Sequence, residues 1–190
     1  MTGASGAIYG IRFLEHACGH FGTIHLIASP HALQVVETEL GRAVDRSRPT
    51  VEALLGRSEP RIALLDPKDY FSPPASGSYR HDGMVVVPCS MGTAGRIAHG
   101  VSDDLLTRAA DVCLKEGRPL VLVVRETPWN LIHLRNLTRL AEAGATIMPA
   151  APAFYTRPTT IEDLVDTVVA RILQRLGVNQ KVMPQWQFPE

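Results

Sequence analysis

Residues 84–93 read MVVVPCSMGT, and this stretch decides the fold class. Its first four residues, 84–87, form a continuous apolar run of the kind found in a parallel strand that is buried on both faces. The small and polar residues that follow, 88–93, predict a turn into a helix whose first N–H groups and hydroxyls can face an anion. Taken alone, that turn is also an ordinary strand-to-helix connection. A buried strand that leads directly into a helix predicts an α/β fold.

Strand-like and helix-like segments alternate along the rest of the chain. The other predicted strands are residues 23–27, 61–65, 120–124 and 145–148. Helices are predicted for residues 7–17 and 32–40 and after three of the later strands, residues 72–83 form a Pro/Gly/Ser-rich loop, and residues 42–60 stay unassigned. This alternation predicts one domain over residues 1–190, with a parallel sheet covered by helices on both faces. Ligands of such folds bind at the carboxyl ends of the strands.

The composition narrows the possible functions. The 190 residues carry 19 Lys plus Arg and 19 Asp plus Glu, so there is no basic surplus of the kind that nucleic-acid and membrane-surface binders carry. No apolar run is long enough for a transmembrane helix, and the first residues do not resemble a secretory signal. The three cysteines, Cys18, Cys89 and Cys113, are odd in number and widely spaced, which favours a reducing, cytoplasmic location.

Three later helices carry end signals. Ser102 is predicted to cap a helix that has two aspartates in its first turn. Thr127 followed by Pro128 is typical of a cap and a first helical position. Thr160 with Asp163 forms the pattern of a capping box at the start of the last helix.

Charged residues near the predicted strand ends are candidates for function. Arg125 and Glu126 directly follow a buried strand, and they form either a structural salt bridge or an anion-binding arginine beside a proton-transferring glutamate. Arg108 and Lys115 lie seven residues apart, so two helical turns place them on nearly the same face. They are either a solvated helix face or half of a phosphate site. Cys89 has no activating neighbour in sequence, and we interpret it as a packed cysteine.

The first ten residues, MTGASGAIYG, have the glycine spacing of a loop that cradles an anion. Such a loop normally follows a strand, and here only Met1 precedes it. We therefore expect a central place in the sheet to be empty or filled by another segment, and we expect lower stability because the neighbouring strands would lack ladder partners.

Five segments in order carry a resemblance to a known family. They are GASGAIYG, PPASGS, PCSMGTAGRIAHGVSDDLLTRAADVCLKE, LVLVVRETP and MPAAPAFYTRP, and together they span nearly the whole chain. They resemble the UbiX family of flavin prenyltransferases. The resemblance implies a flavodoxin-like Rossmann fold that binds FMN. It also implies an enzyme that joins a dimethylallyl group from dimethylallyl phosphate to N5 and C6 of reduced FMN, without a metal.

The same resemblance implies roles for individual residues. It assigns FMN contacts to Ala4, Ser5, Gly6, Ser29, Ser90, Met91, Gly92, Thr93 and Arg125. It assigns the dimethylallyl phosphate site to Arg108, Lys115, Tyr155, Arg171 and Trp186. It assigns catalytic roles to Glu126, Glu39 and Ser5. It further implies a dodecamer with active sites at subunit interfaces, where we place the tail from about residue 178 to 190, and a UbiD-type decarboxylase that receives the prenylated FMN.

Physical chemistry supports this set of residues. A phosphate that leaves without a metal needs several cations, which Arg108, Lys115 and Arg171 can supply. Positive charge that develops on the prenyl carbon is stabilised by π faces, such as the flavin and Trp186. The ring proton at C6 must be removed, and Glu126 or the departing phosphate can take it.

Three positions depart from the family pattern, and two other functions compete. Gly92 replaces a common lysine, Asp104 a common asparagine and Trp129 a common leucine. One alternative is an FMN-dependent cysteine decarboxylase, but that class carries Pro-x-Met-Asn where this chain has Pro-Cys-Ser-Met. The other is a non-catalytic FMN-binding accessory subunit of an aromatic-acid decarboxylase, which would not need a second phosphate site.

Overall fold

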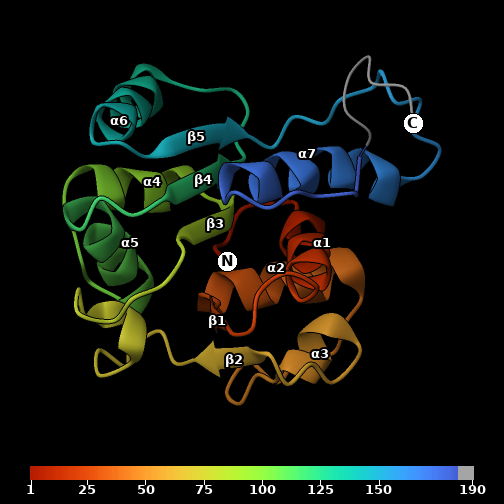
Figure 1. Ribbon diagram of the computed structural model, residues 1–190, viewed down its shortest axis with the longest axis horizontal. Helices are drawn as coiled ribbons and strands as arrows, with labels where there is room; N and C mark the ends of the chain where they lie inside the picture. Colours follow the sequence, from red (N-terminus) through yellow and green to blue (C-terminus); the bar gives the residue numbers. More distant parts are fainter. Residues whose placement is uncertain (184–190) are drawn as a thin grey trace.

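The computed structural model describes residues 1–183, and Figure 1 shows its strands with helices around them. The strands are β1 Ile24–Ile27, β2 Ile62–Leu65, β3 Met84–Cys89, β4 Leu120–Val124 and β5 Thr146–Pro149. The helices are α1 Ala7–Ala17, α2 Pro30–Leu40, α3 Val51–Leu55, α4 Met91–Ala98, α5 Leu105–Lys115, α6 Leu131–Glu142 and α7 Ile161–Arg175, with a 3-10 turn η1 at Pro73–Ala75. Within residues 1–183, no helix combines the length and the apolar character needed to cross a bilayer.

The predicted α/β architecture is confirmed, and β4 shows why. All five of its residues are buried, as the apolar run at 120–124 predicts. Leu122 and the residues two positions away on either side pack with α4, α5 and α6, whereas Val121 and Val123 pack with α1 and α7. Because successive side chains of a strand point to opposite faces, a strand with helices on both sides must be apolar throughout.

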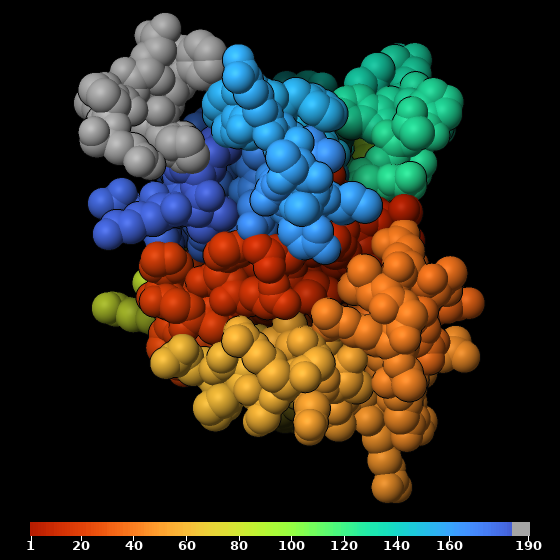
Figure 2. Space-filling view, turned by 90° about the vertical axis from the view of Figure 1, so that its right-hand side faces the viewer, coloured from red at the N-terminus to blue at the C-terminus, as the bar shows by residue number. Residues whose placement is uncertain are grey.

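The strands form two separate parallel sheets. β1 pairs with β2, and β3, β4 and β5 pair in that order. Figure 1 places the N-terminus between β1 and β3. There the nitrogen of Met1 donates to the carbonyl of Ile27 at 2.6 Å, and the amide of Thr2 donates to the carbonyl of Pro88 at 3.2 Å. The first two residues therefore bridge the carboxyl ends of β1 and β3, and Figure 2 shows the N-terminal segment, in red, between the orange and yellow segments on one side and the blue segments on the other.

A cavity of about 180 Å³ occupies the rest of the gap between the sheets. β1 and β3 form two of its walls, and Phe13 and Leu14 of α1 contribute apolar side chains. His25 and Tyr79, which also line it, stack with their ring centroids 5.5 Å apart. Atoms that face a void lose dispersion contacts, so we keep the expectation that this gap lowers the stability of the fold.

Two helix starts differ from the prediction. α5 is capped by Asp104, whose carboxylate accepts from the amide of Thr107, and Ser102 lies before the helix. α6 is capped by Asn130, and Thr127 lies before it. In both cases a second capping residue stands two or three positions downstream of the predicted one, and packing decides which of them begins the helix. The capping box at Thr160 is confirmed.

Candidate active site

Three helices begin at the edge of the sheets where the strands end, which we call the carboxyl edge. α1 begins after Gly6, α2 after Ser29 and α4 after Ser90. Ser90 directly follows β3, and Ser29 lies two residues after the end of β1. Each helix N-terminus presents N–H groups that have no partner within the helix backbone, and the positive end of a helix dipole. The carboxyl edge is therefore suited to an anion, as the sequence predicts.

The Ser5–Gly6 turn is held by a carboxylate from α2. Gly6 has a φ of +99°, a left-handed conformation that favours glycine. The amides of Gly6 and Ala7 donate to the carboxylate of Glu39 at 2.9 and 2.8 Å. Because these two N–H groups belong to the start of α1, Glu39 acts as a cap that is supplied by a different helix.

Electrostatics keep Glu39 ionised. Partial burial by itself would raise the pKa of Glu39, but hydrogen bonds from Ser5, Ala7 and Gly6 together with the charge of Arg125 lower it below its ordinary value. Glu39 therefore carries a full negative charge at neutral pH and receives a hydrogen bond from the Ser5 hydroxyl. The structure brings two of the predicted catalytic residues, Ser5 and Glu39, into direct contact.

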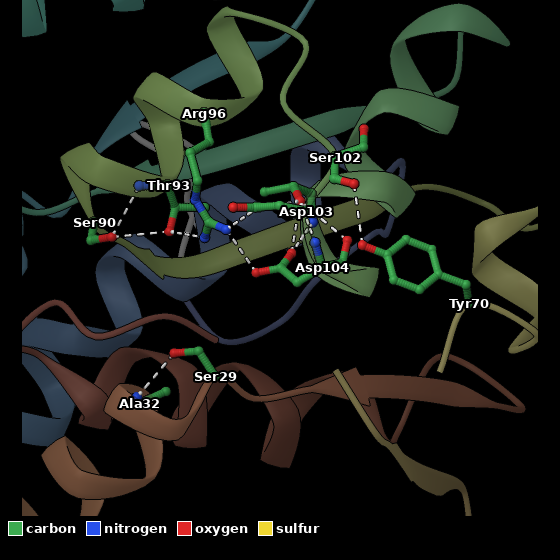
Figure 3. Close-up of polar contacts among 10 residues, drawn as sticks. Ser29, Ala32, Tyr70, Ser90, Thr93, Arg96, Ser102, Asp103 and Asp104 are labelled. Atoms are coloured by element: carbon green, nitrogen blue, oxygen red, sulfur yellow. Dashed lines mark hydrogen bonds and ion pairs between the residues drawn. The ribbon is translucent and has the colours of Figure 1, made fainter. Parts of the chain in front are cut away.

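Hydroxyl groups cap the two other helices. The Ser29 hydroxyl accepts from the amide of Ala32 at 3.1 Å. The Ser90 hydroxyl accepts from the amide of Thr93 at 3.3 Å and donates to the Thr93 hydroxyl at 3.0 Å. Figure 3 shows Ser29 on α2 and the Ser90–Thr93 pair on α4. A hydroxyl that accepts in a cap still has a hydrogen or a lone pair for a ligand.

Arg125 and Glu126 form no ion pair with each other within the described chain. Both are exposed after β4, and the Glu126 carboxylate accepts from the amide of Thr127 at 3.1 Å. Burial raises the pKa of Tyr9, and the charge of Arg125 opposes that rise. The charge of Arg125 also helps to lower the pKa of Glu39. The structure therefore does not support the interpretation of Arg125 and Glu126 as a mutual salt bridge.

A pocket of about 400 Å³ lies beside β5 and α7. Apolar side chains such as Ile147 and Val168 line it, and Tyr155 and Arg171 add polar groups. The β5–α7 connection is fixed by the amide of Ala153, which donates to the Thr167 hydroxyl at 2.9 Å. An apolar wall beside a guanidinium and a phenol suits a short hydrocarbon that carries a phosphate.

The structure does not bring Arg108 and Lys115 to this pocket within one chain. Arg108 donates to the carbonyl of Ala75 at 3.1 Å, and Lys115 contacts Glu116. Both lie on α5, which packs on the face of β3 and β4 opposite to α7. α5 spans 11 residues, or about 16 Å of rise, so Lys115 lies far from the helix end near the carboxyl edge.

The remaining predicted residues have varied environments. Ala4 and Met91 are buried at the starts of α1 and α4. Gly92 is exposed, with no atom within 4 Å of the position that its Cβ would take. Burial raises the pKa of the Cys89 thiol to about 12, in agreement with its interpretation as a packed cysteine. Trp186 lies outside the described residues.

Sequence reasoning missed three residues at this edge. The Thr2 hydroxyl accepts from the amide of Ser90 at 2.8 Å and so joins the chain start to α4. Tyr9 of α1 donates to the carbonyl of Ala150 at 3.5 Å, beside the pocket. Arg96 joins α4 to α5 through ion pairs. No motif marks these residues, because each acts through a partner that is distant or not obvious in sequence.

Known proteins are similar to this chain over nearly its whole length. The Flavoprotein family matches residues 1–173. The flavin prenyltransferase UbiX of Pseudomonas aeruginosa is 46% identical over 190 residues, covering 98% of this chain and 91% of that protein.

Two solved structures have closely similar folds. One is AnUbiX (PadA1) in complex with FMN and dimethylallyl pyrophosphate, with a TM-score of 0.86 and 41% identity over 100% of this chain and 96% of that one. The other is a dodecameric FMN-dependent UbiX-like decarboxylase from Escherichia coli O157:H7, with a TM-score of 0.85 and 37% identity over 99% of this chain and 100% of that one.

Proposed function

The chain belongs to the UbiX family of flavin prenyltransferases, and we propose that the residues gathered at its carboxyl edge carry out that activity. The enzyme joins a dimethylallyl group from dimethylallyl phosphate to N5 and C6 of reduced FMN. The observation that supports the assignment of the site is that the starts of α1, α2 and α4 share the carboxyl edge with the end of β5, which lines the 400 Å³ pocket.

The residues at the carboxyl edge fit FMN. The capping hydroxyls of Ser29 and Ser90 and the exposed side chain of Arg125 follow the ends of β1, β3 and β4 at this edge. Capping hydroxyls and helix N-termini supply donors that suit a phosphate. We assign FMN binding to Ala4, Ser5, Gly6, Ser29, Ser90, Met91, Gly92, Thr93 and Arg125. When bound, reduced FMN supplies the nucleophilic atoms N5 and C6.

The pocket beside β5 suits the dimethylallyl group and its phosphate. Arg171 can hold the phosphate oxygens through two parallel hydrogen bonds, and Tyr155 offers a hydroxyl donor. The apolar wall excludes water from the prenyl carbon as its bond to the phosphate breaks. We assign Trp186 to the same site from the family pattern.

A second subunit completes the cation set in this proposal. Arg108 and Lys115 lie on the opposite face of the β3–β5 sheet from Arg171, so they can join a phosphate at Arg171 only if another copy presents its α5. The dodecameric relative from Escherichia coli supports such an assembly. We propose a dodecamer in which residues 1–190 act as one domain and the tail from about residue 178 lies at a subunit interface.

The two glutamates at the site have different roles in this proposal. Glu39 stays ionised and fixes the Ser5 hydroxyl through the hydrogen bond described above. Glu126 is exposed beside Arg125, where its carboxylate can accept the proton released at C6. The departing phosphate is the alternative acceptor for that proton.

The test is the mass of the flavin after anaerobic incubation of the protein with FMN, a reductant and dimethylallyl phosphate. A flavin heavier by one five-carbon prenyl unit supports the proposal. FMN that copurifies with the protein but stays unmodified would favour the accessory-subunit function instead.

We further propose that a UbiD-type decarboxylase receives the product and that the protein is cytoplasmic. Transfer of the product to a purified decarboxylase and cell fractionation test these two points.

A further inference from the structure

Arg96 lies on α4, about one helical turn after Thr93, and its guanidinium is held from two sides (Figure 3). Its Nη1 donates to Asp103 at 2.5 Å and to Asp104 at 2.8 Å. Its Nη2 donates to the Thr93 hydroxyl at 3.5 Å. Side chains on a helix lean toward its N-terminus, which is why Arg96 reaches back to the loop.

The contact with Thr93 continues to the helix cap. Thr93 Oγ1 accepts from Arg96 and also from the Ser90 hydroxyl at 3.0 Å. A hydroxyl oxygen accepts two hydrogen bonds and donates one. Within the described residues both acceptor positions of the buried Thr93 hydroxyl are therefore used, and no described acceptor takes its own hydrogen.

The aspartates determine what Arg96 contributes. Asp104 caps α5 and Asp103 precedes it, so the guanidinium is neutralised where it sits. Arg96 therefore supplies orientation rather than free positive charge to the loop. Gly92, on the same face one turn earlier, brings no side chain that could support the loop.

We propose that Arg96 is a positioning residue for FMN. Arg96 acts through Thr93 and does not touch the flavin. It fixes the hydroxyls of Thr93 and Ser90 in the orientation that receives FMN, and it ties this loop to the start of α5. The inference rests on the proposed function, because it assumes that FMN binds at this loop.

The test is a thermodynamic cycle on FMN affinity in the full chain, with the dissociation constant measured by quenching of flavin fluorescence. We compare wild type, Arg96→Ala, Thr93→Val and the double variant. Each single change is expected to weaken binding about tenfold, which corresponds to one charge-assisted hydrogen bond. If Arg96 acts through Thr93, the double variant binds within about twofold of Thr93→Val alone.

Control variants separate positioning from general stability. Arg12→Ala removes ion pairs to Glu15 and Asp166 between α1 and α7, so it should lower thermal stability without changing FMN affinity. Asp104→Asn keeps the cap of α5 but removes one anchor of Arg96, and we expect an intermediate loss of affinity.

Two results would overturn the inference while leaving the function intact. One is an FMN affinity of Arg96→Ala that equals that of wild type. The other is a double variant whose loss of binding free energy equals the sum of the two single losses. A wild-type chain that binds no FMN would refute the proposed function together with the inference.

Discussion

Replacing Ser29 by aspartate should separate two roles of the α2 N-terminus. The Ser29 hydroxyl caps the helix by accepting from the amide of Ala32 at 3.1 Å, and an aspartate carboxylate caps equally well. We therefore expect the unfolding free energy of Ser29→Asp to lie within about 0.5 kcal/mol of the wild-type value. Ser29→Ala, which removes the cap, should lose about 1 kcal/mol.

The effect on FMN affinity should be the reverse. An aspartate at position 29 would place a negative charge about 5 Å from a phosphate bound at the same N-terminus. Two unit charges at that distance repel by about 3 kcal/mol at an effective dielectric constant of about 20. FMN should therefore bind roughly 100-fold more weakly to Ser29→Asp. Ser29→Ala loses one hydrogen bond from a hydroxyl to the charged phosphate, which amounts to about tenfold.

The assay combines urea unfolding with a fluorescence titration of FMN on the same preparations. Thr50→Asp is the matched control, because Thr50 caps α3 through the amide of Ala53 at 3.1 Å, before the amino end of β2. It should leave both the stability and the FMN affinity nearly unchanged. If Ser29→Asp binds FMN as tightly as wild type, the α2 N-terminus does not hold the flavin phosphate, and the reasoning is refuted.

Three further changes test other parts of the site. Glu39→Gln should destabilise the fold by about 1 kcal/mol near neutral pH, because charge-assisted hydrogen bonds to the start of α1 are lost. Since the pKa of folded Glu39 lies below its ordinary value of 4.5, this wild-type advantage is complete above pH 4.5 and is lost as the pH falls through the folded pKa. Urea midpoints on both sides of that pH check it, and a constant difference would contradict it. Arg171→Ala should raise the KM for dimethylallyl phosphate at least about tenfold and leave FMN affinity unchanged, and a parallel loss of both would place Arg171 at the flavin instead. Gly92→Ala should raise the unfolding free energy by about 0.5–1 kcal/mol, because the position is helical and open; calorimetry that finds a loss would indicate strain there.

Local patterns in the sequence were enough for most of the secondary structure. The apolar run at 120–124 is β4, and the capping box at Thr160 begins α7. Both signals depend on chemistry within a few residues, namely burial on both faces and hydrogen bonds over one turn. The predicted starts of α5 and α6 were wrong, because a local pattern does not choose between neighbouring capping residues. Several polar residues could cap each helix, and in the structure Asp104 and Asn130 do so, in capping boxes with Thr107 and His133.

The sequence by itself determined the α/β class and the residue types that meet at the carboxyl edge, because strand ends and loop chemistry can be read along the chain. The motifs also determined the family. Only the tertiary structure decided that Glu39 caps a helix that begins 32 positions before it. Only the tertiary structure, likewise, put Arg108 and Lys115 on the far side of the sheet from Arg171. These relations depend on which helix face packs on which side of the sheet, and that is set by burial of apolar surface over the whole chain.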